Sequence, residues 1–88
     1  MEQELSDICL DDILVGDKRI IIYNDDYNTF EHVEFCLQTV LGHSFEQAQQ
    51  CTLLIHYKGK CDVKKGEESI LISKCEQLIT YGLDARIE

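Results

Sequence analysis

Two groups of polar side chains in this sequence could do chemistry. The first is Asn24, Asp25 and Asp26, which follow three consecutive isoleucines. Their amide and carboxylate oxygens accept hydrogen bonds and could hold a cation, organic or metallic. The second is His56, at the end of an apolar-periodic segment. Its imidazole could accept a hydrogen bond, act as a general base or bind a metal.

Each group also has a purely structural interpretation. Asn and Asp hydrogen-bond their own backbone and often end a strand in a turn. Successive strand residues point to opposite faces, so Asp25 and Asp26 cannot both face one ligand without a bend. His56 could satisfy the last carbonyls of a helix, and no second metal ligand lies at a suitable spacing. We therefore expect no catalysis, no metal and no cofactor, and leave a binding site and a simple turn both open.

Charge and cysteine content exclude several classes of protein. The 88 residues carry a formal net charge of -9, which argues against nucleic acid, whose phosphates need Lys and Arg. No apolar run approaches the roughly 20 residues of a membrane helix, and no secretory signal is recognisable. The five cysteines form no C-x-x-C pair, so we expect free, mostly buried thiols in a cytoplasmic protein.

The elements that position these groups are predicted in the order β-α-α-β-α-β. Isoleucines before Asn24 indicate a buried strand, and Phe30, Val33 and Leu37 recur at helical spacing. We predict a strand at 18–23, then a helix capped by Asn28 and ended by Gly42. A second helix should begin at Ser44 and fade near Ile55 and His56. A weak strand at 57–63, a turn at 64–66, a helix at 67–81 and a strand at 83–88 complete the predicted chain.

This order predicts one small α+β domain of two layers, in which three helices pack against a three-stranded antiparallel sheet. Six acidic residues and no basic residue precede Lys18, so we place the boundary there. Residues 1–17 would form an acidic flexible N-terminal extension, and residues 18–88 the core. Four lysines between 58 and 65 could be a docking patch or a solvated loop.

Two signatures taken together resemble a known family. They are Asn24-Asp25-Asp26-Tyr27, followed by Phe30-Glu31, and later His56-Tyr57-Lys58-Gly59-Lys60. The sequence is similar to ClpS, the adaptor that delivers substrates of the N-degron pathway to the Clp ATP-dependent protease. The resemblance runs from about Lys18 to Tyr81, and it implies the same β-α-α-β-α-β fold.

The resemblance also implies a function and two surfaces. The protein would be a monomeric adaptor that binds N-termini beginning with Leu, Phe, Tyr or Trp and hands those substrates to the N-terminal domain of a Clp AAA+ ATPase. The implied N-degron pocket comprises Asn24, Asp25, Asp26, Asn28, Phe30, Val33, Thr52, Ile55, His56 and, less surely aligned, Leu83. The implied ATPase-docking surface comprises Lys74, Ser69, Glu68, Lys64 and Lys65.

The sequence departs from the family pattern at several positions. Phe30 and Thr52 stand where the family commonly has Met, so we expect an altered preference that extends to β-branched first residues. Ser69 stands at a position where the family often has an acidic residue. Asn28-Thr29 stands where the family usually has Thr-Pro. Two alternatives remain open: a domain of the same fold with another partner, as in the ribosomal stalk, and a metal or enzyme site built on Asp25, Asp26 and His56.

Overall fold

The computed structural model describes residues 18–88, so the predicted acidic extension at 1–17 lies outside the described residues. The elements are β1 (Lys18–Tyr23), α2 (Phe30–Leu41), α3 (Phe45–Lys58), β2 (Lys60–Gly66), α4 (Glu68–Thr80) and β3 (Asp84–Ile87). Their order confirms the predicted β-α-α-β-α-β chain of an α+β domain. Within residues 18–88, no helix is long and apolar enough to cross a membrane.

The three strands form an antiparallel sheet in the order β2-β1-β3. The central strand β1 carries the three isoleucines, all of them buried, as expected for a strand with a neighbour on each edge. Lys18 pairs with Gly66 at one end of β1, and Tyr23 pairs with both Lys60 and Asp84 at the other. Asn24 and the residues after it therefore leave the sheet at the end where β2 begins.

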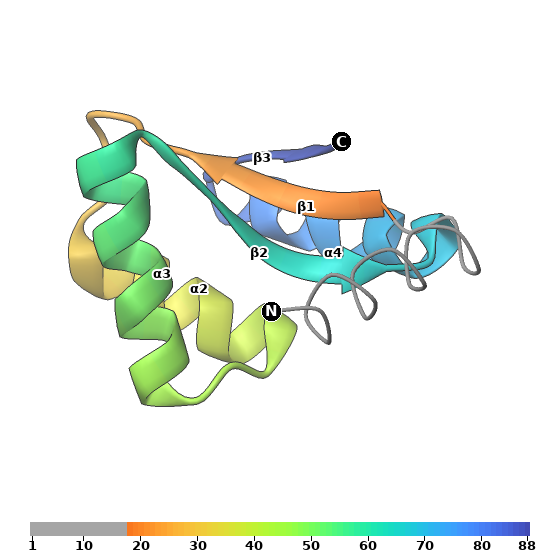
Figure 1. The fold of residues 1–88 in the computed structure, drawn as a ribbon, viewed down its shortest axis with the longest axis horizontal. Coiled ribbons are helices and arrows are strands. Elements are labelled where there is room, and N and C mark those ends of the chain that lie inside the picture. Colours follow the sequence, from red (N-terminus) through yellow and green to blue (C-terminus); the bar gives the residue numbers. More distant parts are fainter. Residues whose placement is uncertain (1–17) are drawn as a thin grey trace, which may run out of the picture.

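The helices divide into two groups around this sheet (Figure 1). Helix α4 runs behind the strands, whereas α2 and α3 pack against each other at the end of the sheet where β1 finishes. Apolar side chains from all six elements meet in one core. Its largest fully buried members are Ile20, Ile22, Cys36, Leu37, Leu71 and Leu78.

The helix ends follow from local sequence. Ser44 and Gln47 form the predicted capping box at the start of α3, where each side chain bonds the backbone N–H of the other residue. Gly42 ends α2 in the left-handed region, with φ 73° and ψ 21°. Gly82 has φ 95° directly after the cap of α4, so it also stands where an L side chain would be strained.

Three sequence-based expectations about the elements are wrong. The cap of α2 is Thr29, whose hydroxyl accepts from the backbone N–H of His32 at 3.1 Å, and not Asn28. Helix α3 does not end near Ile55 and His56, where its apolar periodicity fades, but continues to Lys58 and is ended by Gly59. Residues 64–66 are strand rather than turn, since β1 supplies partners for Lys64 and Lys65 that the sequence pattern does not reveal.

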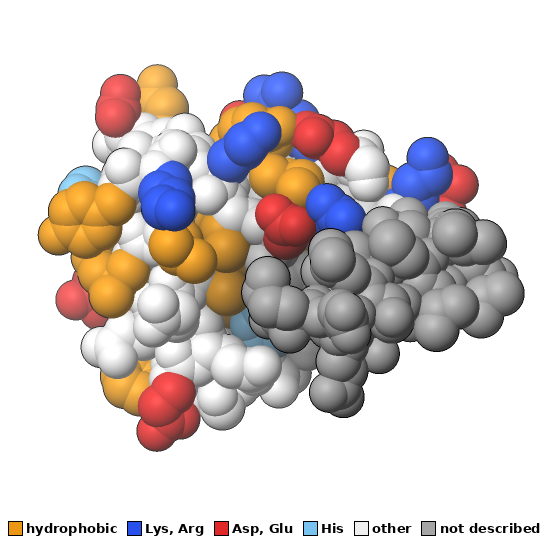
Figure 2. All heavy atoms as spheres, in the orientation of Figure 1, with side chains coloured by type: hydrophobic (Ala, Val, Ile, Leu, Met, Phe, Trp, Pro, Cys, Tyr) orange, Lys and Arg blue, Asp and Glu red, His pale blue; other side chains and the backbone are white. Residues whose placement is uncertain are grey.

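The surface mixes charge with exposed apolar groups. On the face shown in Figure 2, acidic and basic side chains lie close together along the strands, whereas hydrophobic side chains gather over the helical end. Arg19 in β1 and Asp62 in β2 form an ion pair, with 3.6 Å between their charged atoms. An exposed pair of this kind contributes little stability, about 0–1 kcal/mol.

Candidate functional site

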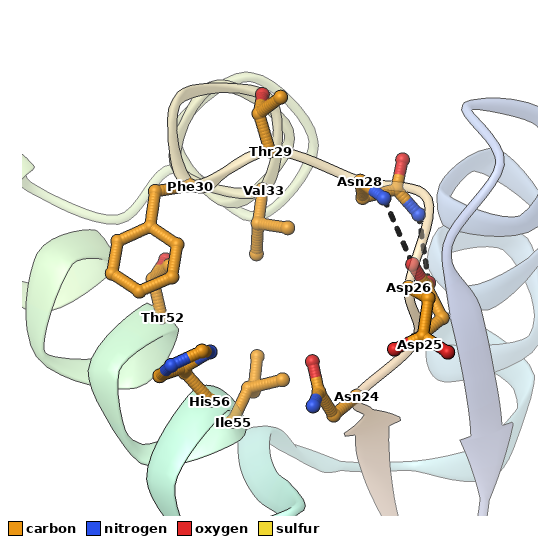
Figure 3. Close-up of a pocket in the computed structure, with 10 residues that line it drawn as sticks. All are labelled: Asn24, Asp25, Asp26, Asn28, Thr29, Phe30, Val33, Thr52, Ile55 and His56. Carbon is orange, nitrogen blue, oxygen red and sulfur yellow. Dashed lines mark hydrogen bonds between the residues drawn. The ribbon is translucent and has the colours of Figure 1, made fainter.

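A pocket of about 270 Å³ opens between the β1–α2 loop, the first turns of α2 and the second half of α3. Figure 3 shows side chains from these three segments arranged as a ring around an open centre. The lining residues are Asn24, Asp25, Asp26, Asn28, Thr29, Phe30, Val33, Thr52, Ile55 and His56.

One half of the ring is apolar. Val33 from α2 and Ile55 from α3 are both buried and face each other across the pocket. Thr52 is also buried, and its hydroxyl donates to the carbonyl of Ala48 at 2.7 Å, so this hydroxyl needs no partner in the pocket. This half therefore offers a surface that favours an apolar group.

Phe30 and His56 close one side of this apolar half. Their rings meet edge to face, with centroids 5.0 Å apart and planes at 70°. Phe30 is 39% exposed, which places it at the mouth of the pocket rather than in the core. A pair of this geometry contributes about 0.5–1.5 kcal/mol beyond burial, so the two helices are held together at this rim.

The polar half is organised by Asp25. Its Oδ1 accepts from the backbone N–H groups of Tyr27 at 2.8 Å and Asn28 at 2.9 Å. Its Oδ2 accepts from the Asn28 side chain at 2.7 Å. Partial burial raises the pKa of the Asp25 carboxyl, but the two backbone N–H groups, the Asn28 amide and the charge of His32 together hold it below 3.8.

Asn28 connects this loop to the far side of the fold. Its side-chain nitrogen donates to Asp25 and also to the carbonyl of Gly82, at 3.0 Å. Gly82 lies in the turn between α4 and β3, 54 residues along the chain. The side chain that the sequence indicated as a helix cap is therefore a clamp between two loops.

Three lining side chains keep acceptors or charge available. Among residues 18–88, the side chains of Asn24, Asp26 and His56 accept no hydrogen bond from another described group. Asn24 is nevertheless fixed at its backbone, since its N–H donates to the carbonyl of Gly59 at 2.9 Å. That bond ties the end of β1 to the end of α3, and it sets the distance between the walls that carry Asn24 and His56.

The structure brings nine of the ten residues of the implied pocket together. The exception is Leu83, which is 4% exposed and packs in the hydrophobic core. Thr29 lines the pocket and was not named from sequence. The only sequence signal that Thr29 lines the pocket was its position beside Asn28 at the start of a predicted helix. A residue that caps this helix lies at the rim of a pocket formed at that helix end.

The five residues of the implied docking surface lie elsewhere. Lys64 and Lys65 are half-buried in β2, Glu68 and Ser69 are exposed in the first turn of α4, and Lys74 is half-buried farther along α4. The start of α4 follows Gly66, the partner of Lys18, and so lies at the opposite end of the sheet from Asn24. The described residues contain no cluster of three or more His, Cys, Asp or Glu side chains that could hold a metal.

Comparison with known proteins decides the family. Residues 17–86 match the family described as ATP-dependent Clp protease adaptor protein ClpS. The chain belongs to the ClpS family. The ClpS adapter of Thermosynechococcus vestitus is 35% identical over 66 residues, which cover 74% of this chain and 70% of that protein. The ClpS adapter of Nostoc sp. is also 35% identical, over 74% of this chain and 68% of its own.

A solved ClpS structure has the same fold. Agrobacterium tumefaciens ClpS2 bound to L-phenylalaninamide matches with a TM-score of 0.79 at 23% identity, over 82% of this chain and 94% of that one. At this identity the likeness establishes the ClpS fold and nothing finer. The family itself is that of adaptors of the Clp protease, so an adaptor role for this chain is established at that level.

The Asp25 contacts predict how stability depends on pH. The folded-state pKa of Asp25 is lowered, so its ionised form contributes stability above pH 3.8, and this contribution is lost as the pH falls through the folded-state pKa. We expect Asp25→Asn to lower the free energy of unfolding by about 1 kcal/mol at pH 7. The difference from the unmodified chain should shrink below pH 3.8. Urea unfolding by circular dichroism between pH 7 and 2.5 measures it, and a difference that grows toward acid pH would contradict the assignment.

Proposed function

We propose that this chain binds the free N-terminus of proteins whose first residue is bulky and hydrophobic, and that it hands them to a Clp AAA+ ATPase. The observation that carries the proposal is the division of one pocket into two halves. Val33, Thr52 and Ile55 form an apolar half, and Asn24 and His56 bring unused acceptors beside it. A free amine and an apolar side chain on the same carbon atom match these two halves.

The amine matches the polar half by charge and by hydrogen bonding. A peptide α-amino group has a pKa near 7.7–8.0, so at neutral pH it is mostly a cation with three N–H donors. The Asn24 amide oxygen and a neutral His56 nitrogen supply acceptors, and water can complete the set. Asp25 and Asp26 add negative charge nearby. Because three donors already occupy the Asp25 carboxylate, we assign Asp25 a positioning role and an electrostatic one.

The apolar half matches the first side chain by size. An enclosed apolar cavity of about 150 Å³ already holds benzene, so a pocket of about 270 Å³ has room for an aromatic or branched side chain together with an amine. The ligand of the related ClpS2 supports this proposal, because L-phenylalaninamide combines a free amine with a phenyl side chain. No residue of the ring is arranged to break a bond, so the proposed activity is binding.

The proposal predicts a defined order of first-residue preference. Peptides that begin with Leu, Phe, Tyr or Trp should bind, and Thr52 should leave room for the branch of Ile or Val. One misplaced methyl group costs about 1–3 kcal/mol. Because Thr52 leaves room for the branch, we expect the lower end of this range, so that peptides beginning with Ile or Val bind about tenfold more weakly than the Leu peptide. Fluorescence anisotropy with labelled peptides that differ only in the first residue measures the series.

The matched control in that series is the same Leu peptide preceded by one glycine. Its amine remains free, but the leucine is no longer first, so binding should fall to background. Ile and Val peptides that bind no better than the glycine-preceded control would remove the proposed role of Thr52. Equal binding of every peptide, the control included, would remove N-terminal recognition itself.

We place the second half of the function on the surface formed by Lys64, Lys65, Glu68, Ser69 and Lys74. The end of β2 and the start of α4, which carry four of these five residues, lie at the other end of the sheet from the pocket, so an ATPase domain bound there would leave the pocket open. Titration calorimetry against the isolated N-terminal domain of a Clp ATPase tests it. If the chain binds Leu peptides but gives no heat of binding with the ATPase domain, the proposed docking surface is wrong and the function is restricted to peptide binding.

A further inference from the structure

Two successive carbonyl groups in the turn between α4 and β3 are bonded by side chains from the region where α2 begins. The carbonyl of Gly82 accepts from the Asn28 side chain at 3.0 Å. The carbonyl of Tyr81, the residue that caps α4, lies 2.8 Å from Nε2 of His32 in the first turn of α2. Carbonyls at the end of a helix have no partner within it, so a side chain that bonds one of them attaches that helix end to another element. His32 thus attaches the start of α2 to the end of α4.

The geometry of this contact fixes the role of the imidazole nitrogen. A carbonyl oxygen can only accept, so Nε2 of His32 carries the hydrogen and donates it. The thiol of Cys36 lies 3.6 Å from the same nitrogen, but Cys36 is 0% exposed. Because Nε2 is a donor and the thiol is enclosed, these two side chains do not make an activated nucleophile for a substrate. The half-buried imidazole is left with a role in holding the fold.

Ring contacts strengthen the same junction. The ring of Tyr81 meets the rings of His32 and Phe35 edge to face, with centroids 6.4 Å and 6.0 Å apart. His32 and Phe35 are three residues apart on α2, so Tyr81 packs against two neighbouring side chains of one helix. The end of α4 is therefore attached to α2 by a hydrogen bond and by two aromatic contacts.

We propose that His32 is a positioning residue for the pocket, and this inference rests on the proposed peptide binding. His32 does not line the pocket, but its neighbours Val33 and Phe30 do. The bond from His32 to Tyr81 holds the helix that carries this wall. The bond from Asn28 to Gly82 holds the loop before it, so wall and loop are fixed to the same turn. A wall fixed in advance need not be ordered when a peptide binds, and affinity gains accordingly.

His32→Phe tests this role, because it removes the donor and keeps an aromatic ring beside Tyr81. We expect its affinity for a Leu peptide to fall about fivefold, the factor that corresponds to one neutral hydrogen bond. His32→Gln offers an amide N–H in place of Nε2–H and should bind within about twofold of the unmodified chain. Fluorescence anisotropy on the full chains measures these affinities.

The control for a general loss of stability is Ser44→Ala, which removes the cap of α3. Its affinity for the Leu peptide should be unchanged. A His32→Phe chain that binds as tightly as the unmodified chain would overturn the proposal. So would a His32→Gln chain that binds as weakly as His32→Phe, because the hydrogen bond would then not be what positions the wall.

Amide hydrogen exchange followed by NMR tests the same role without any peptide. The backbone N–H groups of Tyr27 and Asn28 donate to Asp25 in the loop that the clamp holds. They should exchange about fivefold faster in His32→Phe and keep their rates in Ser44→Ala, because loop amides exchange by local opening rather than by global unfolding. If the unmodified chain bound no Leu peptide, the proposed function would fail, and these rates would still decide whether His32 holds the loop. Equal rates in His32→Phe and the unmodified chain would show that it does not.

Discussion

An acetylated peptide that begins with Phe should bind this chain about a hundredfold more weakly than the same peptide with a free amine. Acetylation removes the positive charge and leaves at most one N–H donor for the acceptors of Asn24 and His56. Losing two charge-assisted hydrogen bonds of about 1.5 kcal/mol each amounts to about 3 kcal/mol, or a factor of about one hundred in Kd. Competition against a labelled Leu peptide, followed by anisotropy, measures the ratio.

The control for acetylation is a peptide that carries one acetylated lysine side chain and a free N-terminus. It has undergone the same chemical change and the same loss of charge at another position. This peptide should bind within about twofold of the unmodified one. Equal affinity for the N-acetylated and free peptides would show that the polar half of the pocket does not recognise the amine.

Asn28→Ala should have the second-largest effect, and it should act on stability and binding together. The substitution removes the hydrogen bonds from the Asn28 side chain to Asp25 and to Gly82. We expect the free energy of unfolding to fall by about 1–3 kcal/mol. The loop that carries Asn24 and Asp25 would also lose its link to the α4–β3 turn, so affinity for a Leu peptide should fall by about tenfold.

A variant that destabilises the fold elsewhere separates these two effects. Ser44→Ala removes the cap at the far end of α3, where the side chain bonds only Gln47, and should lower stability by about 1 kcal/mol. Its affinity for the Leu peptide should be unchanged. If both variants lose affinity in proportion to their loss of stability, the clamp formed by Asn28 has no role in binding beyond folding.

The sequence predicts the elements well where the signal is local. Isoleucines at 20–22, the Ser44 and Gln47 capping box and the glycines at 42 and 82 need only neighbouring residues, and the structure contains each of these features. The second strand was mispredicted because Lys64 and Lys65 have low strand propensity. They join β2 because β1 supplies an antiparallel partner, and such pairing between distant segments leaves no local trace.

In the candidate site, too, the sequence predicted local features better than contacts between distant segments. Resemblance to ClpS indicated most of the ring, but it did not indicate how the ring is held. For Asp25 the sequence left a ligand acceptor and a backbone turn both open, and the fold uses its oxygens to shape the loop. Asn28 suited a helix cap by residue type and spacing, yet its amide reaches Gly82, 54 residues away. Roles of this kind depend on tertiary contacts, and no periodicity in the sequence reports them.

The antiparallel register of β1 and β2 has a consequence for delivery. It separates the pocket, beside the Tyr23 and Lys60 pair, from the start of α4, beside the Lys18 and Gly66 pair. The two proposed sites, at opposite ends of one sheet, would make the domain a bivalent bridge. A substrate captured at one end would then stand at a fixed distance from the ATPase held at the other, and its effective concentration there would depend on geometry rather than on its abundance in solution.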